Sequence, residues 1–127
     1  MGVFIKFCEE SVAVVADIEA MFHQVYVEPE DCDALRFLWW PNGDLNDEPQ
    51  EYCMVKRLFG AISSPSCANF CLKKTALIYQ AEFVFVTVQT VKENMYVEDL
   101  MKSVSSPVIA IRLPTQLLEL LAKGGFR

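Results

Sequence analysis

Short hydrophobic runs alternate with acidic and turn-forming segments along the first half of the chain, which predicts short strands and tight turns. The valine-rich run at 11–17 ends in Asp17 and is typical of a strand buried on both faces. Large β-prone side chains at 35–40 and 52–59 flank turn residues and acids, so we expect a hairpin with a long acidic tip. A proline followed by acids predicts a short helical turn at 28–31.

The second half of the chain begins with a predicted helix. Ser64 as the N-cap and Pro65 at the first helical position mark its start. Two lysines, Lys73 and Lys74, are expected on its outer side, away from an apolar stripe that faces the core. The residues of that stripe are Cys67, Phe70, Cys71 and Ile78.

The segments that follow give mixed signals. Residues 81–94 are ambiguous, because a strand-like run at 84–86 precedes a stretch at 88–94 that fits a helix. Residues 95–100 predict a strand, a tight acidic turn and a second strand.

The last predicted element is a helix that Gly124 and Gly125 bring to an end. Pro114 lies inside its apolar pattern and is expected to kink or split it, since a proline costs roughly 3 kcal/mol in an uninterrupted helix. The residues of the pattern are Ile109, Leu113, Leu117, Leu120 and Leu121. The order of elements predicts one domain of the α+β class, with helices packed on one face of a mostly antiparallel sheet.

The net charge of the chain and its distribution limit which macromolecules the chain can bind. The net charge is −6, but residues 1–51 hold 12 acids and 2 bases, whereas residues 52–127 hold 5 acids and 9 bases. An acidic chain binds phosphate backbones poorly, so contact with nucleic acid would involve the second half or divalent metal ions. The absence of a signal peptide and of a long apolar run predicts an intracellular protein with no membrane partner.

The five cysteines are odd in number and form no C-x-x-C pair. We therefore expect free thiols in preference to a disulfide framework. A zinc site would have to combine distant cysteines with His23, the single histidine of the chain, and is the less favoured alternative.

Three acids occur where predicted strands end. Asp17 closes the first strand, and Glu98 and Asp99 occupy the tip of the hairpin at 95–100. Neighbouring strands would bring these carboxylates together, where they repel one another unless cations neutralise them, and a pair of Mg²⁺ ions would do so. The alternative is a strand-end acid and an ordinary acidic turn.

Three segments share the order and spacing of one family. They are 16–22 (Ala-Asp-Ile-Glu-Ala-Met-Phe), 58–65 (Leu-Phe-Gly-Ala-Ile-Ser-Ser-Pro) and 96–99 (Tyr-Val-Glu-Asp). The chain resembles the palm subdomain of reverse transcriptases, in particular those of Pao/BEL long-terminal-repeat retrotransposons. The resemblance extends from Ser11 to Phe126 and is weakest at 80–94.

The resemblance implies roles for eight residues. Asp17, Glu98 and Asp99 match the catalytic acids that bind two Mg²⁺ ions. Phe22 matches an aromatic residue that leaves no room for a 2′-hydroxyl and so favours deoxynucleotides; core packing is the alternative. The residues that match the substrate-binding positions are Ile18, Phe22, Phe59, Gly60 and Tyr96.

The chain departs from the family in two residues and in extent. Glu98 stands where the family has Asp and adds one methylene, about 1.5 Å of reach. Pro114 lies where the family helix continues unbroken. Residues 1–127 correspond to a partial reverse transcriptase domain, with the palm core present, the fingers incomplete and the thumb absent.

The expected function is RNA-directed DNA synthesis in the parent enzyme, by two-metal nucleotidyl transfer. Its partners would be an RNA or DNA template with primer, deoxynucleotides and the rest of a retroelement polyprotein. It would act in a cytoplasmic particle or in the nucleus. Two alternatives remain: an inactive relic or co-opted palm that acts as an interaction domain, and a small acid-cluster phosphohydrolase.

Overall fold

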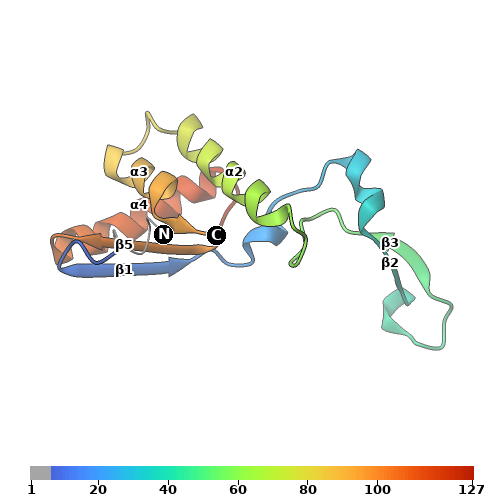
Figure 1. The fold of residues 1–127 in the computed structure, drawn as a ribbon. Helices are drawn as coiled ribbons and strands as arrows, with labels where there is room; N and C mark the ends of the chain where they lie inside the picture. The colour runs from blue at the N-terminus through green and yellow to red at the C-terminus, as the bar shows by residue number, and fades with distance from the viewer. Residues whose placement is uncertain (1–6) are drawn as a thin grey trace.

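The computed structural model describes residues 7–127, which form a body and a projecting arm (Figure 1). The body holds a three-stranded antiparallel sheet in the order β1–β5–β4, with bounds Val12–Asp17, Asp99–Val104 and Met95–Tyr96. Three helices cover one face of this sheet: α2 (Ser64–Ile78), α3 (Phe85–Glu93) and α4 (Pro107–Lys123). The prediction of an α+β fold with helices on one face of an antiparallel sheet is confirmed.

Strand β1 forms where the valine-rich run predicted it, but the expectation that both of its faces are buried is wrong. Side chains alternate between the two faces of a strand, and Val14 is buried on the face that the helices cover. Val15, on the opposite face, is 65% exposed. β1 lies at the sheet edge, and in the described part of the chain no second layer covers this outer face.

Helix α2 starts at Ser64, so the cap position falls on Ser63, one residue before the predicted cap. The predicted stripe is wrong for Phe70 and Ile78, which are exposed. Cys67 and Cys71 are half-buried, and Cys71 packs against the core. The buried face consists of Ser64, Ala68, Leu72, Thr75 and Ala76, of which all but Leu72 are small. Small residues allow close helix packing, which outweighs the size of the apolar side chains at the predicted positions.

Gly124 illustrates how closely the helices approach. A Cβ atom at this position would overlap the Thr75 side chain of α2 and lie 2.7 Å from its Cγ2. The residue that ends α4 is therefore also a packing residue, since a side chain of any size would push the two helices apart.

Within the ambiguous segment at 81–94, residues Phe85–Glu93 fold as helix α3, so the strand-like run at 84–86 forms no strand. Val88 and Val91 are buried at helical spacing, and the Thr90 hydroxyl donates to the Val86 carbonyl at 2.7 Å. Tertiary burial of this face overrides the β propensity of the valines.

Of the kink or split expected at Pro114, the split does not occur, because helix α4 continues through this residue. Its apolar face is buried over Leu113, Leu117, Leu120 and Leu121. Burial of four leucine side chains offsets one missing backbone hydrogen bond, because each contributes about 1.5–3 kcal/mol. The helix starts at a cap where the Ser106 hydroxyl accepts from the Ile109 N–H at 3.5 Å.

The arm comprises residues 28–53. Its elements are the 3₁₀ helices η2 (Pro29–Leu35) and η3 (Pro41–Gly43) and the antiparallel strands β2 (Arg36–Trp39) and β3 (Gln50–Cys53). The predicted helical turn and hairpin are thus confirmed, but the second strand is shorter than the predicted 52–59. Residues 55–57 instead pair with 25–27 at the base of the arm, where the Val27 N–H donates to the Val55 carbonyl at 3.0 Å.

All five cysteines are free thiols, as expected. Among the described residues, 7–127, no helix has both the length and the apolar character required to cross a bilayer.

Candidate functional site

The centre of the candidate site is a pair of carboxylates on neighbouring strands. Asp17 ends β1, Asp99 begins β5, and the register places them directly opposite each other. The Ile18 N–H donates to the Glu98 carbonyl at 3.1 Å, just beyond the pair. This bond makes Asp17–Asp99 a non-hydrogen-bonded pair, in which facing Cβ atoms are closest, at roughly 4.5–5.5 Å.

This pair lies on the uncovered face of the sheet. Asp17 follows Val15 by two residues, so both side chains leave the strand on the face opposite the helices. Asp17 is exposed and Asp99 is half-buried. Like charges directly opposite each other on a sheet are destabilising by roughly 0.2–1 kcal/mol. A bound cation between them would remove that cost.

Glu98 and Val97 form the two-residue turn that joins β4 to β5. Val97 has a φ of 57°, in the left-handed region that β-branched residues rarely adopt. A residue held in this conformation destabilises the folded state by about 1–3 kcal/mol, and strained residues of this kind concentrate at functional sites. The backbone of Glu98 is anchored by its carbonyl bond with Ile18, so the turn holds Glu98 next to Asp99 and opposite the end of β1.

Three predicted substrate-binding residues gather beside the end of β1. Phe22, in the 3₁₀ helix η1 (Met21–Gln24), is 5% exposed. Its ring packs edge-on against Phe59 with centroids 4.8 Å apart. Phe59 is 57% exposed, and its ring also packs edge-on against the His23 ring, with the centroids 5.5 Å apart. Gly60 follows with a φ of 82°, a conformation that glycine adopts without strain.

The other two predicted substrate-binding residues occupy different surroundings. Ile18 is buried in the core directly after Asp17, where it fixes the end of β1. Tyr96 is half exposed at the end of β4 and pairs with Asp99 in the strand register. The structure therefore brings Asp17, Glu98, Asp99 and Tyr96 to one end of the sheet.

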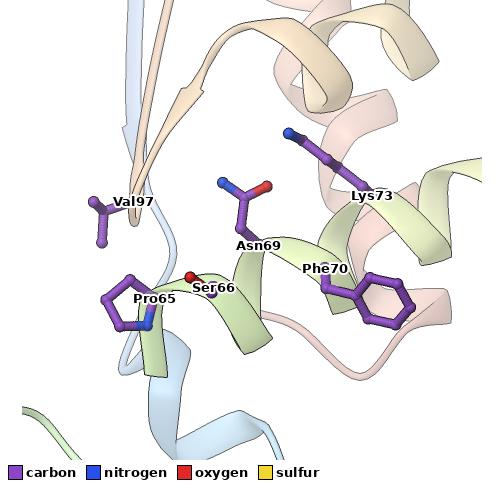
Figure 2. Close-up of a pocket in the computed structure, with 6 residues that line it drawn as sticks. All are labelled: Pro65, Ser66, Asn69, Phe70, Lys73 and Val97. Carbon is purple, nitrogen blue, oxygen red and sulfur yellow. The ribbon is translucent and has the colours of Figure 1, made fainter. Parts of the chain in front are cut away.

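A hollow of about 400 Å³ separates this end of the sheet from helix α2 (Figure 2). Val97 lines it from the turn, and five residues line it from the helix, namely Pro65, Ser66, Asn69, Phe70 and Lys73. Figure 2 shows the Asn69 and Lys73 side chains extending toward the strands, whereas Phe70 points away. Lys73 gives the hollow a positive charge beside the acidic turn.

Ser66 and Asn69 were not among the residues expected at the site, and Val97 was expected there only as a member of the 96–99 motif. The signal for two of them was present, because Ser66, Asn69 and Lys73 recur at helical spacing on the outer face of a helix that begins with Ser-Pro. The conformation of Val97 had no signal in the sequence, since its side chain favours a strand.

The carboxylate pair fits a divalent cation by its donor chemistry. Mg²⁺ prefers oxygen ligands, and proteins usually supply one or two carboxylates while water and substrate phosphates complete the shell. Asp17 and Asp99 supply that number on a rigid ladder, with Glu98 as the adjacent acid. Within residues 7–127 the structure gathers no cluster of three His, Cys, Asp or Glu side chains that could hold a metal ion.

Comparison with models of known protein families and with curated proteins finds no match to this chain. The features that bear on function are therefore the geometry of the site and the three motifs at 16–22, 58–65 and 96–99. Those motifs lie together in space: segments 16–22 and 96–99 meet across the β1–β5 ladder, and Phe59 of segment 58–65 packs on Phe22.

Proposed function

We propose that this chain is the palm part of an RNA-directed DNA polymerase of the Pao/BEL reverse transcriptase type. The observation that carries the proposal is the Asp17–Asp99 pair, directly opposed on the uncovered face of the sheet and bordered by a strained two-residue turn. Sites for small-molecule substrates are concave and enclose most of the ligand. An open face suits a long duplex substrate, which must slide past the acids after each addition.

Asp17, Asp99 and the neighbouring Glu98 would hold the metal ions. When bound, two Mg²⁺ ions would favour ionisation of the primer 3′-hydroxyl and stabilise the charge that develops on the phosphates. The contribution of the chain is to fix the carboxylates. β1 and β5 share a continuous ladder from Val12 to Asp17, which limits the movement of both acids.

The surrounding residues would position the substrates. Phe59 presents an exposed ring, held against Phe22, on which a base can stack. Phe22 packs edge-on against the Phe59 ring. The two rings together would therefore determine which sugar the site accepts. Asn69 and Lys73 line the hollow between helix and turn, where a phosphate backbone finds a hydrogen-bond donor and a positive charge.

Paramagnetic Mn²⁺ tests the metal site on the chain itself. We expect Mn²⁺ at low ratios to broaden the amide signals of residues 16–18 and 98–100 first. Asp17→Asn should abolish this broadening, and the matched control Asp47→Asn, on the acidic arm, should leave it unchanged. Broadening confined to residues 28–53 would contradict the proposal, because it would show that Mn²⁺ follows overall negative charge.

A chimera that places this chain between the fingers and thumb of an active reverse transcriptase tests the reaction. Asp17→Asn and Asp99→Asn should each abolish templated extension.

In the same chimera, Phe22→Ala should raise ribonucleotide incorporation relative to deoxynucleotide incorporation, by an amount worth about 1–3 kcal/mol. An unchanged ratio in a folded chimera would assign Phe22 to the core alone.

One observation favours the second candidate, a palm fold that acts only as an interaction domain. Glu98 carries one methylene more than the family aspartate, and misplacement of a reacting group by about 1 Å can cost on the order of 100-fold in rate. In the chimera, Glu98→Asp should raise the single-turnover extension rate by about 10- to 100-fold. Absence of extension from both forms, with Mn²⁺ bound at the pair, would favour the interaction domain.

A further inference from the structure

The arm displays a continuous aromatic face. Phe37 and Tyr52 are cross-strand partners whose rings stack at 5.8 Å, and Trp39 follows Phe37 by two residues on the same face. All three side chains are exposed, Trp39 by 54%. The hairpin projects from the body, so the described part of the chain leaves this face uncovered (Figure 1).

An isolated two-stranded hairpin of this kind needs a covering layer. Hairpins of two strands are at best marginally stable in water, and independent stability takes a third strand or a packed helix. Every residue of β2 and β3 is exposed. Burial against a partner stabilises aromatic side chains strongly, because each can bury about 150–250 Å² of its surface.

The charge of the arm indicates the chemistry of that partner. Residues 28–53 contain eight acids and one base, Arg36, for a formal charge of −7. Arg36 is already engaged by Asp33, at 2.9 Å, and by Glu51. The other acids lie before and after β2, in η2 and its N-cap and in the loop at the tip.

This charge excludes two classes of macromolecule on electrostatic grounds. A nucleic acid carries a dense negative charge that a surface of −7 repels. Anionic bilayers repel it in the same way. A polypeptide with lysine or arginine side chains is complementary to both the acids and the aromatic face, because its cations can pair with the acids and lie over the rings.

The base of the arm shows such a contact within the chain. The Lys56 ammonium lies over the Tyr26 ring, with Nζ 3.2 Å from the ring centroid. Lys56 and Tyr26 face each other in an isolated antiparallel bridge at the arm base. A basic strand beside the aromatic face would repeat this arrangement along β2 and β3.

We infer that the aromatic face formed by Phe37, Trp39 and Tyr52 is a docking surface for an extended, basic polypeptide segment. The segment would present alternating apolar and basic side chains. Its apolar residues would cover the rings, and its cations would reach the acids of η2 and of the tip. This inference is independent of the polymerase proposal, since no residue of the arm belongs to the carboxylate site.

Selection from a displayed library of random 12-residue peptides tests the inference. We expect the enriched peptides to carry net positive charge and apolar residues, and to bind less tightly as salt rises. Trp39→Ser should lower the affinity for a selected peptide by at least about tenfold, as loss of a central aromatic residue usually does. The matched control Phe85→Ser, which alters an exposed ring on α3, should change the affinity by less than about twofold.

A second pair of variants separates charge from aromatic contact. The double substitution Asp47→Asn with Glu48→Gln should reduce the affinity several-fold and flatten its salt dependence. Glu119→Gln, an exposed acid on α4, should do neither. Because these residues contribute nothing to the body core, the circular dichroism of all variants should match that of the unmodified chain.

Several outcomes would overturn the inference. These are enrichment of neutral or acidic peptides, failure to enrich any peptide, and binding that Trp39→Ser does not weaken. Binding of a single-stranded RNA or of anionic vesicles that Trp39→Ser abolishes would assign the face to another class of partner. A dimer in sedimentation velocity that Trp39→Ser dissociates would show that a second copy covers the face.

Discussion

Leu120 in helix α4 and Leu38 in strand β2 are the same side chain in two surroundings. Leu120 is fully buried among residues of the sheet and the helices, whereas Leu38 is 65% exposed on the arm. Both lie in segments whose apolar pattern predicts regular structure, and both segments form it. Apolar pattern therefore determines which element forms, whereas burial depends on whether another layer of the structure packs on that element.

The first prediction contrasts these two leucines. Leu120→Ala should lower the free energy of unfolding by about 2–5 kcal/mol, because it removes buried methyl groups and leaves a cavity. Leu38→Ala should change it by less than about 0.5 kcal/mol. Urea unfolding followed by circular dichroism measures both. A loss above 2 kcal/mol for Leu38→Ala would mean that the arm is packed in solution, and the comparison would fail.

The fold class could be predicted because strands and turns are local. Val12–Asp17 and the hairpin at 95–100 follow from side-chain propensity and spacing, and both form, although the turn lies at 97–98, one residue before the predicted tip at Glu98 and Asp99. Orientation could not be predicted. Phe70 and Ile78 are larger apolar residues than Ala68 and Ala76, yet α2 buries the alanines, because close approach of Thr75 to Gly124 sets which side faces inward.

The candidate site was predictable to a similar depth. Each acid could be placed at a strand end from the sequence, but the direct opposition of Asp17 and Asp99 depends on the β1–β5 register. That register pairs residues more than eighty positions apart, and no local signal specifies it. The left-handed Val97 is unpredictable for a different reason, since tertiary context imposes the conformation against the preference of the residue.

The second prediction concerns the acids of the two regions. Without divalent metal, Asp17→Asn should raise the free energy of unfolding by about 0.2–1 kcal/mol, because it removes one of two opposed like charges. Asp47→Asn, on the exposed arm, should have a smaller effect, since no register holds a second acid opposite it.

Addition of Mg²⁺ sharpens this test. Mg²⁺ should stabilise the unmodified chain, since a ligand that binds only the folded state raises its stability. It should not stabilise Asp17→Asn. The measurement is thermal unfolding of each variant with and without Mg²⁺ at constant ionic strength. Equal stabilisation of both variants would show that the opposed pair is not the metal site.

The last and smallest expected effect compares two thiols. Burial raises the pKa of Cys32, at the root of the arm, and the charges of Cys53, Asp33 and Asp31 raise it further. Burial also raises the pKa of Cys71 in α2, but there the charge of Cys67 raises the pKa while Arg57 lowers it. Both thiols should therefore react slowly with iodoacetamide at pH 8, because only the thiolate is nucleophilic.

Salt should separate the two thiols. Screening weakens the effect of charges but leaves that of burial unchanged. The pKa of Cys32 should therefore fall as salt rises, its thiolate fraction at pH 8 should increase, and its labelling should accelerate by up to about threefold. For Cys71 the opposing charges are screened together, so its rate should change less. Mass spectrometry of labelled peptides gives each rate, with the exposed Cys8 as the internal reference. Equal salt responses of Cys32 and Cys71 would show that the acids of η2 do not act on the Cys32 thiol, and that the arm root is electrostatically no different from the body.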